Sequence, residues 1–76
     1  MKMEDTIKKF LEKETQRKIE SETENLIEKG VLDSFSMIKF INFIETDLGV
    51  KIDMEELSSE NFNSIKTIVS TIKKWK

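Results

Sequence analysis

The fold is decided by residues 30–49, GVLDSFSMIKFINFIETDLG, which contain one helix with its start and its stop. Gly30 can take the left-handed conformation that closes a preceding turn, and Asp33 can cap a helix by accepting a backbone N–H bond. We therefore predict a helix over residues 34–48, which Gly49 ends. Its apolar residues form one broad stripe: Phe35, Met37, Ile38, Phe40, Ile41, Ile44 and Leu48. We expect Phe35, Phe40 and Ile41 to lie in the core.

Two other segments also have helical spacing of apolar residues. Residues 4–14 carry Ile7 and Leu11 among charged neighbours, which predicts a first helix. Residues 64–75 predict the last helix, with Asn63 or Ser64 as its cap. The residues expected on its buried face are Ile65, Ile68, Val69 and Ile72. Lysines at its end, where the helix dipole favours cations, fit this assignment.

The connecting segments predict little regular structure. Residues 15–33 are polar with isolated apolar anchors, which suits a long loop with one turn of helix near residues 22–29. Asp53 and Glu56 have the spacing of a capping box and predict a short third helix over residues 53–57. No segment alternates with period two, so no strand is expected. The fold class is all-α: a small antiparallel bundle of three longer helices plus one short helix.

Length and composition restrict the function. A chain of 76 residues is long enough for one domain, residues 1–76, with one modest core. It has no cysteine and no histidine, so we expect no metal site and no catalytic residues of its own. The neighbouring carboxylates, Glu12 with Glu14 and Glu55 with Glu56, lack apolar surroundings and should be solvated. No apolar run could span a bilayer, which predicts a cytoplasmic protein without membrane insertion.

Charge is distributed unevenly along the chain. Residues 20–60 hold eleven acidic side chains and three lysines, a local charge of −8, whereas the whole chain carries −2. An acidic middle repels phosphate backbones and attracts basic protein surfaces. Nucleic acid is therefore an unfavourable partner, although a small helix-turn-helix binder remains one alternative.

The dipeptide Asp33–Ser34 has two interpretations. Most such pairs before an apolar helix are only helix caps. In its context, however, the stretch 30–38 resembles the attachment site of acyl and peptidyl carrier proteins, in which a glycine, a short spacer and Asp-Ser precede a large apolar residue and a long helix. The resemblance covers nearly the whole chain. It implies that Ser34 carries 4′-phosphopantetheine and that acyl groups are held on this arm as thioesters.

Elementary electrostatics agrees with that resemblance. A serine in the first turn of a helix lies beside unpaired backbone N–H groups and the positive end of the helix dipole, where a phosphodiester is favoured. Because the chain has no cysteine, the thiol of any thioester must belong to the arm.

Several other residues are candidates for the site. Asp33 and Phe35 flank the attachment serine. Phe62 precedes the last helix, where the arm of the family often lies, although a buried core position is the more common use of such a residue. Candidate partner contacts on the central helix are Ser36, Met37, Lys39 and Asn42, for which a solvated face is the alternative.

The type of carrier follows from the same helix. Carriers of fatty acid synthesis usually have acidic residues soon after the serine, where this chain has Ser36 and Lys39. The stretch 30–35 is more similar to D-alanyl carrier proteins and to free-standing carriers that work with adenylating ligases, and the stretch 60–65 also resembles those free-standing carriers. The implied partners are a phosphopantetheinyl transferase and an acyl- or aminoacyl-adenylating ligase, acting on a monomer. The alternatives are a housekeeping carrier that serves fatty acid or polyketide synthase enzymes, and a helical interaction module without a prosthetic group.

Overall fold

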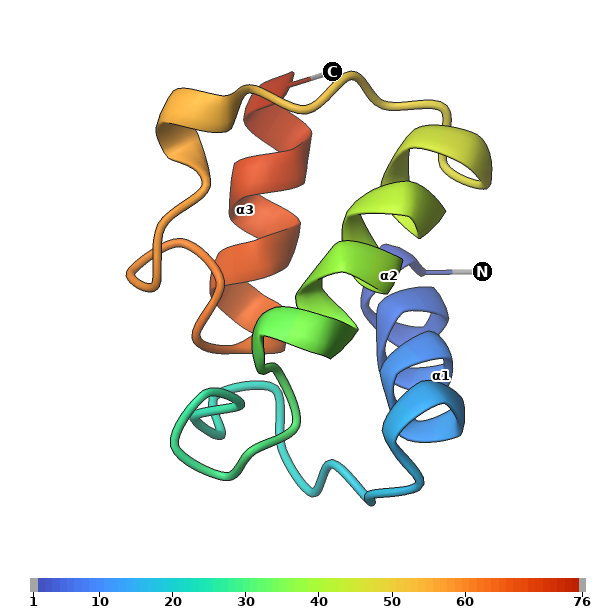
Figure 1. The fold of residues 1–76 in the computed structure, drawn as a ribbon, viewed down its shortest axis with the longest axis vertical. Coiled ribbons are helices and arrows are strands. Elements are labelled where there is room, and N and C mark those ends of the chain that lie inside the picture. The colour runs from blue at the N-terminus through green and yellow to red at the C-terminus, as the bar shows by residue number, and fades with distance from the viewer. Residues whose placement is uncertain (1, 76) are drawn as a thin grey trace.

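A computed structural model describes residues 2–75, which form three α-helices and one short 3-10 helix (Figure 1). The α-helices are α1 (Met3–Thr15), α2 (Ser34–Thr46) and α3 (Ile65–Trp75), and the 3-10 helix is η1 (Met54–Glu56). The described residues contain no strand, as predicted. The radius of gyration is 11.1 Å.

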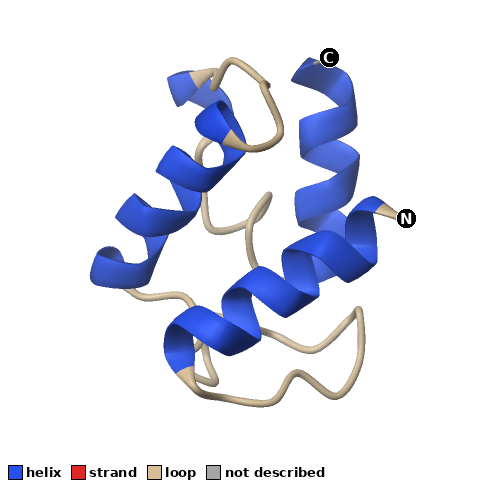
Figure 2. Ribbon diagram, turned by 90° about the vertical axis from the view of Figure 1, so that its right-hand side faces the viewer, coloured by secondary structure: helices blue, strands red, loops and turns tan. Residues whose placement is uncertain are grey.

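The direction of the helices corrects one expectation. In Figure 1, α1 descends from the N-terminus, whereas α2 and α3 both ascend, because the connection between them crosses the top of the molecule and descends to the level of the start of α2 before α3 begins. The predicted antiparallel bundle is therefore not fully confirmed, because α2 and α3 run in the same direction and α1 runs obliquely to α3. Helix α1 contacts both of the others, and Figure 2 shows it running obliquely in front of the start of α3, with α2 to one side of it.

Helix α2 starts where the sequence predicts and ends two residues early. Asp33 is its N-cap, and Gly30 and Gly49 have the positive φ values of 77° and 66° that glycine adopts without strain. After Thr46 the chain leaves the helix, and the N–H of Val50 bonds to the carbonyl of Ile44. The turn at Gly49 thus follows the helix end rather than forming it.

The predicted stripe of α2 was too broad. Phe40 and Ile44 are fully buried, whereas Ile41 and Met37 are only partly buried against the core. Phe35, which was expected in the core, is 59% exposed, and Ile38 is 71% exposed. A helix packed against one neighbour on each side can bury only part of its circumference, so apolar residues outside that arc remain in solvent.

Helix α3 follows the prediction closely. Ile65, Ile68 and Ile72 are fully buried and Val69 nearly so. Ser64 accepts the N–H of Thr67 at 3.2 Å, and the Thr67 hydroxyl accepts the N–H of Ser64 at the same distance. This reciprocal pair satisfies two backbone donors at the helix start.

The connecting segments are less helical than predicted. Residues 22–29 form turns without a helix, and η1 is a single 3-10 turn. Asp53 accepts the N–H of Glu55, but the Glu56 carboxylate bonds to Asn61 and Lys74 in place of completing a capping box. The contact of Glu56 with Lys74, eighteen residues away in the sequence, thus takes the place of the predicted local bond to the Asp53 backbone.

The long loop is held by backbone and side-chain bonds to the helices. The Leu26 N–H bonds to the Asn63 carbonyl at 2.7 Å, and the Lys66 N–H bonds to the Glu22 carbonyl at 2.9 Å. The Glu12 carboxylate accepts the Ile19 N–H at 2.7 Å, so this side chain is structural rather than merely solvated as expected. These bonds fix the loop that leads to α2.

The core fills the space between the helices and the loop. Its fifteen buried apolar residues come from the three α-helices and from the connecting segments, including Ile19, Leu26, Val31 and Leu32 of the loop. Phe62 is fully buried and meets the Phe40 ring edge-on at a centroid distance of 6.1 Å, while Trp75 packs against its other side at 6.0 Å. None of the described helices combines the length and the apolar character that a bilayer crossing requires.

Candidate functional site

Ser34 is the first residue of α2 and is exposed. Beneath it, the Asp33 carboxylate accepts the N–H groups of Phe35 at 3.0 Å and Ser36 at 2.9 Å. The Ser36 hydroxyl accepts the Asp33 N–H at 3.0 Å and donates to the Val31 carbonyl at 2.9 Å. This capping box fixes the backbone around Ser34. The Ser34 side chain itself makes no hydrogen bond within residues 2–75.

The electrostatics of the helix start favour an anion on the serine. The first turn of α2 contains no acidic side chain, so the positive end of its dipole is not neutralised from within the helix. The hydrogen bond from the Ser36 backbone is the largest of several that lower the pKa of Asp33, which therefore stays ionised at neutral pH. Its negative charge is bound to N–H groups of the helix start.

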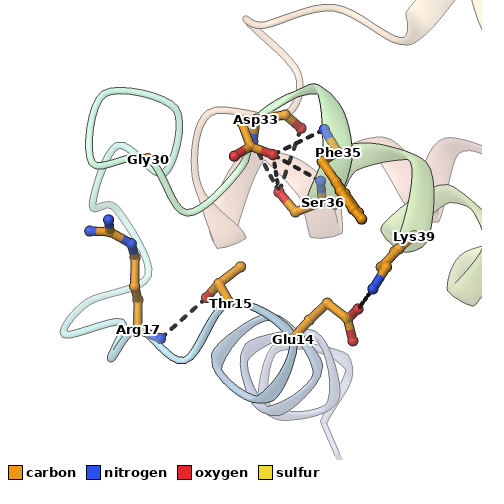
Figure 3. Close-up of a pocket in the computed structure, with 8 residues that line it drawn as sticks. All are labelled: Glu14, Thr15, Arg17, Gly30, Asp33, Phe35, Ser36 and Lys39. Carbon is orange, nitrogen blue, oxygen red and sulfur yellow. Dashed lines mark hydrogen bonds and ion pairs between the residues drawn. The ribbon is translucent and has the colours of Figure 1, made fainter.

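A groove of about 380 Å³ lies beside the start of α2, between this helix and the end of α1 (Figure 3). Lys39 of α2 forms an ion pair with Glu14 of α1 at 2.8 Å, and its ammonium lies 4.8 Å from the centre of the Phe35 ring. The exposed aromatic ring is thus covered on one side by a cation. Arg17 closes the other side of the groove and donates to the Lys29 carbonyl at 3.3 Å.

The structure separates the candidate site residues into two groups. Asp33, Ser34, Phe35 and Lys39 lie together at the start of α2, and Asn42 is exposed two helical turns from Ser34. Phe62 is a core residue with no exposed surface, which confirms the structural interpretation of that position.

Two of the predicted partner contacts already have structural roles. The Ser36 hydroxyl is engaged in the capping box, and Met37 packs partly against the core. Contacts of either residue with a partner stay a prediction.

The end of α1 and the residues just after it contribute to this site, which was not predicted from the sequence. Glu14 was expected to be solvated, yet its side chain is only 27% exposed and pairs with a lysine that lies in the next helix. Arg17 was not singled out at all. Neither residue stands in a local motif, since their places beside α2 depend on how the helices pack. Among the described residues, no cluster of acidic side chains suits a metal ion.

Comparison with known proteins adds a family to this geometry. No curated protein matches the chain in a sequence search. The family model described as "Phosphopantetheine attachment site" matches residues 5–72, which include all of α2, η1 and most of α1 and α3. Members of this family carry 4′-phosphopantetheine covalently on a serine and act as carrier domains. With a match over most of its length and an exposed serine at a capped helix start, the chain belongs to the phosphopantetheine attachment family.

Proposed function

We propose that Ser34 is the attachment serine and that this protein is a specialised, free-standing carrier whose acyl or aminoacyl groups are loaded by an adenylating ligase. The observation that carries the assignment is the exposed Ser34 hydroxyl at the first position of α2, outside the hydrogen bonds of the capping box. A transferase can reach this oxygen without opening the fold.

The residues around Ser34 fit the prosthetic group. The phosphodiester would lie at the start of α2, whose first turn holds no acidic side chain and whose N-cap carboxylate, Asp33, is already hydrogen-bonded to the N–H groups of Phe35 and Ser36. When bound, the group supplies the terminal thiol that holds acyl groups as thioesters, a function no side chain of this cysteine-free protein can perform. The protein itself supplies a rigid attachment point and a surface for the loading enzymes.

The exposed surface of α2 supports a specialised carrier over a fatty-acid carrier. Its first two turns present Phe35, Ile38 and Lys39 to solvent, and the first carboxylate within the helix is Glu45 near its end. A fatty-acid enzyme with a basic docking surface would meet apolar groups and a lysine there. An adenylating ligase whose docking surface is apolar would fit this face.

The test of attachment is the intact mass of the protein expressed with and without a phosphopantetheinyl transferase. The wild type should gain the mass of one phosphopantetheinyl group, and Ser34→Ala should gain none. Ser70→Ala removes another exposed helical serine and is the matched control, which should load like the wild type. Absence of the added mass in the wild type would leave only an unmodified interaction module.

The test of the loading partner uses the modified protein. Adenylating ligases should charge it with an acyl or aminoacyl group, whereas a malonyl transferase should use it poorly. Lys39→Glu, which restores a carboxylate on α2, should improve malonyl transfer. Efficient malonyl loading of the wild type would return the protein to fatty acid synthesis.

A further inference from the structure

The exposed apolar side chain of Ile38 belongs to a second groove. This groove, of about 530 Å³, also lies between α1 and α2 but farther from Ser34. Phe10 of α1 and Phe43 of α2 stack there with ring centres 4.1 Å apart. Ile38, Asn42 and Asp47 line it as well. It therefore combines apolar and polar surface on the outside of the core.

The two grooves are joined at the ion pair. Glu14 and Lys39 line both grooves, so their contact at 2.8 Å lies at the boundary between the groove beside Ser34 and the more distant one. This contact also neutralises Lys39 within the groove, because the lysine charge is paired. The carboxylate of Asp47, by contrast, forms no ion pair with any residue in the described range 2–75.

A row of neighbouring side chains leads from Ser34 into the second groove. Residues four apart on a helix lie one above the other, so Ile38, Asn42 and Thr46 continue the line that begins at Ser34. All three line the groove. The row spans about 18 Å at a rise of 1.5 Å per residue. A phosphopantetheine arm has a chain of about fourteen atoms beyond its phosphate, roughly as many as the backbone of five residues. Fully extended, five residues reach about 18 Å, so the arm is long enough to follow this row.

The charge along α2 matches the two ends of an aminoacylated arm. The positive helix end lies at Ser34 and suits the phosphodiester. The last turn of α2 has no basic residue to offset the negative end of the dipole, and Asp47 adds a carboxylate at that point. A cationic group is favoured there. In an aminoacyl thioester the carboxyl group is used in the bond to sulfur, so the α-ammonium is the free charge.

We propose that the groove formed by Phe10, Ile38, Asn42, Phe43 and Asp47 is the resting site for an aminoacyl group carried on the arm. The inference rests on the proposed attachment at Ser34. The side chain of the amino acid packs on Ile38 and the stacked phenylalanines, and its ammonium faces Asp47. The cargo thus lies on the surface between α1 and α2, while the interior between α2 and α3 is filled by Phe40 and Phe62.

The experiment compares two stable cargoes on the modified protein, after intact mass has confirmed the attachment. A leucyl group and its desamino counterpart, 4-methylpentanoyl, are each joined to the arm through an amide in place of the thioester. Backbone amide NMR shifts are then compared with those of the unloaded, modified protein. The leucyl cargo should shift signals of Phe10, Phe43 and Asp47, and the desamino cargo should shift Asp47 less.

Titration of the leucyl ammonium provides an independent readout. Its pKa should be higher on the protein than on the free pantetheine conjugate, because Asp47 stabilises the charged form. Asp47→Asn should remove this rise, whereas Glu45→Gln, a neighbouring exposed carboxylate that does not line the groove, should preserve it. Ile38→Ser should reduce the shifts at Phe10 and Phe43 for both cargoes.

Three results would overturn the proposal. These are shifts confined to the opposite side of α2 near Met37 and Ile41, the absence of shifts beyond the first turn, or equal effects of Asp47→Asn and Glu45→Gln on the ammonium. Failure of attachment itself would appear earlier, as a missing mass, and would contradict the proposed function instead.

Discussion

Truncation of two isoleucines in α2 distinguishes its buried face from its exposed face. Ile44 is fully buried in the core, whereas Ile38 is 71% exposed six residues earlier in the same helix. Both side chains are identical, and both positions are interior to the helix. Replacing each by alanine therefore removes the same atoms from two different environments.

The expected magnitudes differ severalfold. Ile44→Ala loses the transfer free energy of the buried atoms and leaves a cavity, which together destabilise by about 2–5 kcal/mol. A domain of 76 residues has a total stability of about 4–11 kcal/mol, so this is a large fraction. Ile38→Ala should change stability by no more than about 0.5 kcal/mol, because the lost contacts are few and alanine has the higher helix propensity.

Urea unfolding followed by circular dichroism at 25 °C measures both changes. With a slope of about 1 kcal/mol per molar urea, Ile44→Ala should lower the midpoint by about 2 M or more, and Ile38→Ala should leave it nearly unchanged. The dependence of the unfolding free energy on urea concentration should be equal for the wild type and the two variants, which would show that their midpoints can be compared. A loss below about 0.5 kcal/mol for Ile44→Ala, or above about 1 kcal/mol for Ile38→Ala, would refute the assignment of the two faces.

Three further predictions test the start, the packing and the end of α2. Because the pKa of Asp33 is lowered in the folded protein, its contribution to stability is complete above the ordinary carboxyl pKa and is lost as the pH falls through the lower folded value. Asp33→Asn keeps a hydrogen-bond acceptor but cannot titrate, so the free energy of unfolding should fall less steeply below pH about 4 than in the wild type. An unchanged dependence of stability on pH in this range would contradict the prediction. The side chains of the ion pair are partly exposed, Glu14 at 27% and Lys39 at 52%, so a double-mutant cycle should give a coupling free energy of about 0.2–1 kcal/mol that decreases at high salt. A coupling free energy that does not change with salt would contradict a solvent-screened ion pair. Gly49 has a φ of 66° and open space where a Cβ atom would lie. Gly49→Ala should therefore lower the free energy of unfolding by about 1 kcal/mol through backbone strain alone. An unchanged midpoint of thermal unfolding would contradict this conformation.

Some features of the site were predictable because they depend on residues only a few positions apart. The cap by Asp33 and the left-handed conformation of Gly30 were predicted and are confirmed. A helix cap needs only a suitable acceptor within about three residues, and a positive φ needs only the absence of a side chain. The Ser36 hydroxyl at the third position of the helix completes a capping box that the same spacing could have indicated.

Some core positions were predictable for a related reason. The face of α3 with Ile65, Ile68 and Ile72 was predicted correctly because its apolar residues form a narrow stripe with charged residues opposite. Phe62 is likewise confirmed as a core residue. Where few arrangements can bury the apolar side chains, the pattern alone indicates which residues lie inside.

Other features depended on the packing of the helices. In α2 apolar residues surround most of the helix, so only the packing of α1 and of the segment that carries Phe62 determines that Phe40 is buried while Phe35 and Ile38 are exposed. In the same way, the approach of α1 pairs Glu14 with Lys39 and forms the grooves next to the serine. Local sequence thus determined where α2 begins and which serine it presents, whereas tertiary packing decided which surface surrounds that serine, because contacts between distant segments exist only once the chain has folded.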